Sequence, residues 1–273
     1  MKNVFKIEIL KTLGYPIFWA ILLLHTFFYI LVVILGANID INIQGVHIFR
    51  LFSSTYMWGT MAWIASWFNL LLAIMIIVLT SNELLYNTFR RQLLDGLNRN
   101  QLVLGKLMLV ACLSIYVILI VTISGIIVGS TNSDPWDGQY LHGYRFVLVL
   151  SVQSLAYMSL AMLFGLIFRN TALSIVMYLL YFIIIEPFVR LFFSSNIDSF
   201  FPMKIISNLT PMPDFMGMLA SDLSNIQAVD SNTLSQLQSV PEGISTTIAV
   251  PVCIVYTLLF LFSSSFLLKS RDL

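Results

Sequence analysis

Charged residues are scarce in this sequence. Asp, Glu, Lys and Arg make up 10% of the 273 residues, whereas about a quarter of a typical soluble domain is charged. Hydrophobic residues make up 59%, and the mean hydropathy is +0.91. So little polar surface cannot cover a water-soluble core of this size. The composition therefore predicts an integral membrane protein.

The sequence also has only two cysteines and almost no net charge. The two cysteines, Cys112 and Cys253, lie inside apolar runs, which excludes a disulfide framework and indicates two small buried hydrophobic side chains. The formal net charge is +1, so no strong global field favours a nucleic-acid partner, and none is expected.

The sequence lacks the residue patterns that catalysis requires. It has no paired histidines with a glutamate at metal spacing, no two aspartates in facing apolar runs, and no serine with a histidine at equal depth. Gly105-Lys106 is followed by Leu107, and Asn100 occupies the place of the first glycine of a phosphate-binding loop. We therefore expect no catalytic, cofactor-binding or metal-binding residues in this chain, and no enzymatic activity of its own.

Long apolar runs dominate what is present. A helix needs about 20 mostly apolar residues to cross a bilayer. The sequence predicts an all-α, polytopic membrane protein that forms one transmembrane domain over residues 1–273. Its six expected spans are residues 17–35, 57–79, 107–128, 146–168, 171–193 and 244–268. The fifth is the least regular, because it contains Glu186, Pro187 and Arg190 near its outer end.

The distribution of basic residues predicts the orientation, because Lys and Arg concentrate in short cytoplasmic segments. With both termini in the cytoplasm, ten of the 14 basic residues lie inside, and the opposite orientation reverses the ratio. The four on the outer side are Arg50, Arg145, Arg190 and Lys204. We therefore expect a cytoplasmic N-terminus and C-terminus.

A few polar residues lie within the expected spans. His25 is expected to be a neutral imidazole bonded to another helix, because no carboxylate or second histidine lies at its depth. Asn69 and Gln153 are expected to form hydrogen bonds between helices. Glu186 and Arg190 are four residues apart and can form an ion pair on one face of the fifth span.

Two loops stand out by length. The inner segment between the second and third spans, residues 81–106, is called the connector below. It predicts a helix over residues 83–94, with a ridge of Leu85, Phe89 and Leu93 at four-residue spacing and with Gly96 in a left-handed conformation at its end. The outer loop, residues 194–243, is apolar in its first half and is expected to form short helices that lie at the outer membrane surface or dip into it.

The connector carries a family resemblance. Residues 83–94 (ELLYNTFRRQLL) and 99–106 (RNQLVLGK), together with the inner turn at residues 168–172 (FRNTA), resemble segments of the type-2 ATP-binding-cassette (ABC) exporter permeases. The order of a basic N-terminus, six spans, a long inner loop after the second and a large outer insertion after the fifth is also similar. The connector differs in having Asp95-Gly96 where many relatives carry a proline-containing turn.

The resemblance implies the membrane-spanning permease subunit of an ATP-driven ABC exporter in a bacterial cytoplasmic (inner) membrane. It implies a cytoplasmic ABC ATPase subunit that carries the ATP and Mg, and a second permease chain, identical or paralogous, surrounded by lipid. The connector would act as a coupling helix for the ATPase. The residues assigned to this coupling are Glu83, Leu85, Asn87, Phe89, Arg90, Arg91, Leu93 and Asp95.

The identity of the substrate and the functional class of the protein stay partly open. The many aromatic and methionine side chains suit an amphipathic or apolar cargo, such as a peptide or a lipid-like molecule. One alternative is a proton-coupled or ion-coupled secondary transporter, for which His25 is the available mid-bilayer group. Another is a non-transporting membrane anchor or assembly factor.

Overall fold

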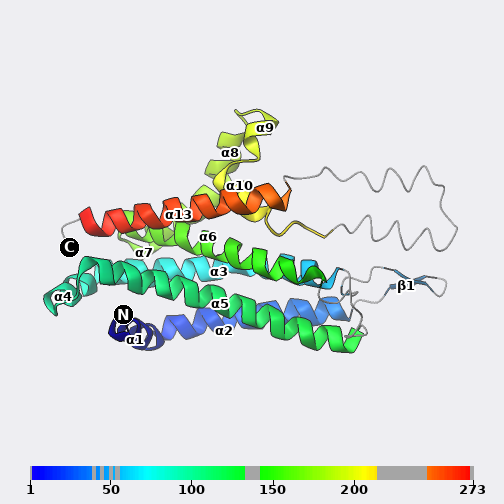
Figure 1. Cartoon of the computed structure of the whole chain (residues 1–273), viewed down its shortest axis with the longest axis horizontal. Helices are drawn as coiled ribbons and strands as arrows, with labels where there is room; N and C mark the ends of the chain where they lie inside the picture. The colour runs from blue at the N-terminus through cyan, green and yellow to red at the C-terminus, as the bar shows by residue number, and fades with distance from the viewer. Residues whose placement is uncertain are drawn as a thin grey trace.

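The computed structural model describes residues 2–38, 41–43, 46–48, 52, 56–132, 142–213 and 245–270, and these are mainly helical (Figure 1). The long and intermediate helices are α1 (Lys2–Leu13), α2 (Pro16–Ala37), α3 (Met57–Leu85), α4 (Thr88–Leu94), α5 (Arg99–Asn132), α6 (Arg145–Phe168), α7 (Thr171–Leu180) and α13 (Thr246–Ser270). The shorter elements are β1 (Ile41–Ile43), β2 (Val46–Ile48), the 3-10 turn His142–Tyr144, the π-helical turn Tyr181–Ile185, α8 (Glu186–Arg190), α9 (Ser195–Asp198) and α10 (Pro202–Ser207). The two strands pair antiparallel as a short hairpin.

Within the described residues, six helices are long and apolar enough to cross a bilayer, which confirms the six expected spans and an integral, multi-pass membrane protein. The fifth of these is formed by α7, the π-helical turn and α8 together. The second and third spans extend further than hydropathy indicates, because α3 continues to Leu85 and α5 already begins at Arg99 within the connector. Residues 214–244, most of the expected outer loop, lie outside the described residues.

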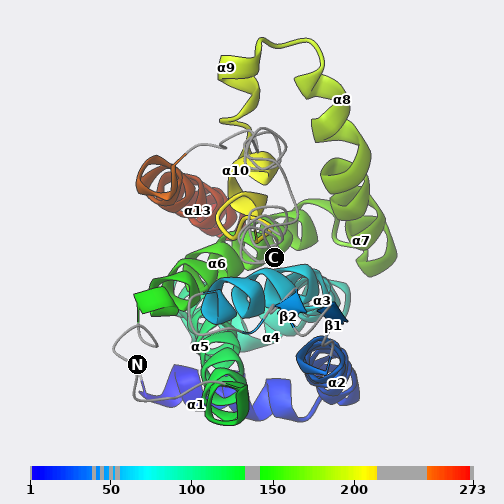
Figure 2. The same ribbon diagram turned by 90° about the vertical axis from the view of Figure 1, so that its right-hand side faces the viewer.

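The centre of the bundle is the pair α3 and α6, which Figure 2 shows between the other long helices. More than half of the most apolar stretch of each is buried, against fewer than a quarter in α2, in α7 with α8, and in α13. Trp58 and Leu72 of α3 and Leu150 and Met158 of α6 are fully enclosed. The apolar side chains exposed on the outer helices require lipid or another protein around them.

Helix α1 runs across the end of the bundle rather than along it (Figure 2). Its inward face consists of Val4, Glu8 and Thr12, all buried and spaced by four residues, while Leu10 and Leu13 are exposed. This face is hard to find by hydropathy because its central member is a carboxylate. We call the end of the bundle that carries α1 and α4 the connector end, and α13 also finishes there (Figure 1).

The fifth span is irregular, as expected, and departs sideways from the bundle (Figure 1). Pro187 has no N–H, and its ring would clash with the carbonyl of Ile183, so a regular α-helix cannot continue through it. The chain forms the π-helical turn Tyr181–Ile185 just before this point. Helices α9 and α10 are the short helices expected between the fifth and sixth spans.

Helix α10 returns to the bundle and packs between α6 and α13. Ile205 and Ile206 are buried there, and the amide of Gln153 on α6 donates a 2.8 Å hydrogen bond to the carbonyl of Ile206. Gln153 lies eight residues into α6, about 12 Å along its axis. The segment after the fifth span therefore re-enters the bundle, in line with the second of the two expected arrangements.

Candidate functional site

The connector folds as two helices joined by a left-handed residue. Helix α3 ends at Leu85, and Asn87 then adopts a φ of 53°, a conformation that asparagine tolerates better than most residues. Helix α4 follows over seven residues. The expected single helix over residues 83–94 is therefore wrong, because a turn at residues 86–87 separates α3 from α4.

The end of α4 follows a common stop pattern. Gly96 has a φ of 93°, which confirms its expected left-handed conformation. The N–H of Leu97 donates to the carbonyl of Gln92 at 3.0 Å, and that of Gly96 donates to the carbonyl of Leu93 at 3.1 Å, which together form a Schellman motif. Two residues later α5 begins, and the side chain of Gln101 accepts from the N–H of Asn98 at 2.9 Å, one of the two hydrogen bonds of a capping box. The connector is thus a defined turn–helix–turn.

The expected ridge of Leu85, Phe89 and Leu93 does not form one docking face. Phe89 is 1% exposed and belongs to the core, and Leu93 is half-buried against it, whereas Leu85 is exposed. The break before α4 ends the four-residue spacing and turns Phe89 towards the bundle. The exposed side chains of residues 85–95, called the connector face below, are Leu85, Tyr86, Asn87, Arg90, Arg91, Leu94 and Asp95.

Glu83 does not belong to the connector face either. It is 1% exposed and forms part of a buried group of four charges with Glu8 and Lys11 of α1 and Lys106 of α5, called the charge cluster below. The Lys106 ammonium lies 2.5 Å from a carboxylate oxygen of Glu8 and 2.5 Å from one of Glu83. Lys11 lies 2.9 Å from Glu8 and 2.7 Å from Glu83.

The charge cluster is neutral in sum, which is why it can be buried. Two carboxylates face two ammonium groups, and the Lys106 nitrogen also lies 5.8 Å from the centre of the Phe89 ring. Removing one member of such a buried group leaves an uncompensated charge and costs about 3–5 kcal/mol. Burial raises the pKa of the Glu8 carboxyl, but Lys106 and Lys11 outweigh it and hold that pKa below its ordinary value.

Further polar contacts join other helices to the connector end. Arg99, the first residue of α5, donates through its guanidinium to the backbone carbonyl of Lys269 in the last turn of α13. Thr171, the first residue of α7, donates to the side-chain oxygen of Asn82 on α3 at 2.8 Å. The inner turn at residues 168–172 is fixed by Asn170, whose side chain accepts from the N–H of Leu173 at 3.2 Å.

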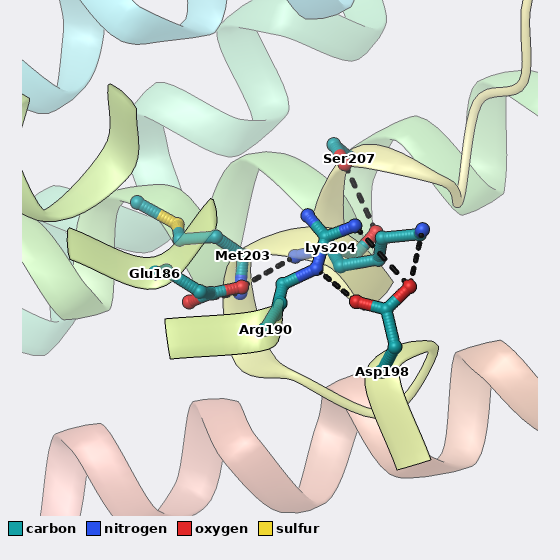
Figure 3. Close-up of polar contacts among 6 residues, drawn as sticks. All are labelled: Glu186, Arg190, Asp198, Met203, Lys204 and Ser207. Carbon is teal, nitrogen blue, oxygen red and sulfur yellow. Dashed lines mark hydrogen bonds and ion pairs between the residues drawn. The ribbon is translucent and has the colours of Figure 1, made fainter. Parts of the chain in front are cut away.

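The expected ion pair between Glu186 and Arg190 is wrong, because each group has other partners (Figure 3). Glu186 accepts hydrogen bonds from the backbone N–H groups of Met203 and Lys204 at 3.0 and 2.9 Å, at the start of α10. Arg190 pairs instead with Asp198 of α9, which Lys204 also contacts at 3.0 Å. These charges hold α8, α9 and α10 together, so their role here is to shape the re-entrant segment.

The polar residues within the spans form contacts between helices. His25 Nδ1 lies 3.0 Å from the hydroxyl of Tyr116 on α5, which confirms its expected bond to another helix. Asn69 accepts from Ser154 on α6 at 3.1 Å, as expected. Gln153 binds α10 and also accepts from Thr210 at 2.9 Å, so it secures the re-entrant segment rather than another long helix.

Sequence reasoning missed Glu8, Lys11 and Lys106 as members of a site. One signal was available, because Glu8 is the single acidic residue among the first 39 and stands three residues before a lysine.

No protein-family model matches this chain, and no curated protein matches it.

Proposed function

We propose that this chain is the membrane-spanning permease subunit of an ATP-driven exporter, with the connector as the docking element for a separate cytoplasmic ATPase. The observation that carries the proposal is the division of the connector into two faces. One face, with Phe89 and Glu83, is built into the bundle, and the other presents Leu94 and Tyr86 beside Arg90 and Arg91. Apolar side chains next to guanidinium groups suit a partner with an apolar pocket and nearby carboxylates.

The connector is also built to pass on a displacement. Helix α4 is continuous in sequence with α3 on one side and α5 on the other, through two turns that are fixed by hydrogen bonds. Its anchors, Phe89 and the charge cluster, tie it to the bundle at a third place. A rigid-body movement of the ATPase would therefore shift α3 and α5 rather than bend a loose loop.

The proposal places the connector end in the cytoplasm of a bacterium, consistent with the basic residues counted there. ATP and Mg are held by the ATPase, and this chain supplies no catalytic group. A second permease chain, identical or paralogous, completes the pathway, and the exposed apolar sides of α2, α7 and α13 offer surface for it and for lipid. An amphipathic or apolar cargo fits such a pathway.

Copurification tests the proposal. The tagged chain, extracted in mild detergent from its own host, should carry along a protein with a GK[ST] phosphate loop. Changing Arg90 and Arg91 together to Glu should abolish this copurification. The matched control is Arg145→Glu, which should not abolish it. Arg145 is also exposed, but it lies at the start of α6, at the opposite end of that helix from the inner turn. Loss of the ATPase in both variants, or in neither, would contradict docking through the connector face.

A further inference from the structure

The charge cluster gives α1 a mechanical connection that chain continuity does not provide. Helices α3 and α5 are joined to α4 directly through the backbone. The first span, α2, has no backbone link to α4. Hydrogen bonds between His25 and Tyr116 and between Tyr29 and Ser124 join its middle to α5, and its first turns continue from α1 through Gly14 and Tyr15. Glu8 and Lys11 of α1 reach the connector through Glu83 and Lys106.

The contact between α1 and α5 is close and specific in register. A Cβ at Gly105 would lie 3.6 Å from Glu8 Oε2 and 3.6 Å from Val4 Cγ1, so α1 packs directly on the first turns of α5. An apolar contact alone would let α1 slide or roll along α5. Two carboxylates alternating with two ammonium groups satisfy one register, because a shift brings like charges together.

We propose that Glu8 and Lys106 are positioning residues that make α1 move with the connector as one body, so that displacement of α4 reaches the first turns of α2 through α1, in addition to the contacts that α2 makes with α5. This inference rests on the proposed function. Neither residue touches a substrate or nucleotide, and both act through the orientation of α1. The contact is buried, with Lys106 2% exposed, so water and salt weaken it little.

Hydrogen exchange of the complete complex, this chain with its ATPase in nanodiscs, tests the inference region by region. ATP with vanadate is the probe, and exchange is compared with the nucleotide-free complex. In the wild type the nucleotide should change exchange in the ends of α3 and α5 and in the first turns of α2. In Glu8→Gln the response in the first turns of α2 should fall while that in α3 and α5 stays. Lys6→Gln, on the exposed face of α1, is the matched control and should behave as wild type.

A reversible cross-link separates positioning from general stability. A sulfur at residue 4 would occupy the place of Val4 Cγ1, so Val4→Cys and Gly105→Cys can form a disulfide once Cys112 and Cys253 are changed to Ala. In the Glu8→Gln background this disulfide should restore the response of α2, and reductant should remove it again. A merely destabilised protein would not be rescued in α2 alone.

The possible outcomes distinguish the two proposals. A wild-type complex in which nucleotide changes exchange nowhere would overturn the proposed function and this inference with it. A response in α3 and α5 together with an unchanged response of α2 in Glu8→Gln would overturn this inference alone. So would a disulfide that blocks the α2 response in the otherwise wild-type chain, because α1 would then have to move relative to α5.

Discussion

Lys106 on α5 and Glu8 on α1 are 98 residues apart in the chain, yet the lysine nitrogen lies 2.5 Å from a carboxylate oxygen of the glutamate. The second carboxylate bound to Lys106 is that of Glu83 at the base of the connector. Helix α1 therefore supports the connector through Glu8 and Lys11. The proposed docking face rests on three helices, α1, α3 and α5.

Truncating Phe89 should lower the stability of the protein, whereas truncating Leu94 should weaken its binding to the ATPase. Phe89 is 1% exposed, so Phe89→Ala should destabilise the protein by about 3–5 kcal/mol. Leu94 is 80% exposed, so Leu94→Ala should change stability by less than about 0.5 kcal/mol while weakening ATPase binding. Thermal unfolding in detergent and a pull-down assay measure the two effects. A large drop in unfolding temperature for Leu94→Ala would show that the connector face is wrongly assigned.

Gly96 should resist substitution for a purely backbone reason. Its φ is 93°, and a Cβ there would meet no atom within 4 Å, so strain and not crowding opposes a side chain. Gly96→Ala should cost about 1–2 kcal/mol and speed amide exchange at the end of α4. Gly96→Asn should cost less, since asparagine tolerates positive φ. Equal rates of amide exchange at the end of α4 in the wild type, Gly96→Ala and Gly96→Asn would contradict the left-handed turn at Gly96.

Asp198 should make the arm of α8–α10 sensitive to acid. Hydrogen bonds from Arg190, and then from Lys204, lower the pKa of its carboxyl from 3.8 to about 2. Because the folded pKa lies below the unfolded one, the stabilisation is complete above about pH 4 and is lost as pH falls towards 2. Limited proteolysis across this range should detect loosening of the arm. Asp198→Asn should abolish that pH dependence, and an unchanged profile would contradict the pairing.

Gly125 should be required where α5 passes α3. A Cβ at this position would lie 2.7 Å from Trp58 Cη2, too close without a shift of a fully buried indole. Gly125→Ala should therefore lower stability by about 1–3 kcal/mol, as measured by thermal unfolding. Gly59→Ala serves as the control, because its Cβ would lie at an ordinary 3.7 Å from the Phe146 ring. Equal stability of both variants would contradict this packing.

Features set by local chemistry could be predicted from the sequence. Apolar length alone indicates six spans, because backbone hydrogen bonding in lipid leaves the chain few alternatives. Gly96 and the irregular fifth span follow from the conformational limits of glycine and proline. His25 and Asn69 were expected to bond across helices, and both do.

Features set by tertiary contacts could not be predicted in this way. The spacing of Glu186 and Arg190 permits a pair, but the N–H groups of α10 and the carboxylate of Asp198 are better placed partners. Phe89 matches a ridge by spacing, yet the left-handed Asn87 before it turns the ring inwards. A search for apolar faces overlooked α1 because Glu8 occupies the middle of its buried side.

Site-specific photo-cross-linking from the connector is the most direct test that it docks an ATPase. A photoreactive amino acid at Leu94, which is exposed, should capture in membranes a protein that mass spectrometry identifies as carrying a GK[ST] phosphate loop. The same group at Phe89 should capture this chain alone, because that side chain faces the core. Capture at Leu94 of lipid alone, or of a protein without a nucleotide-binding domain, would contradict the proposed function.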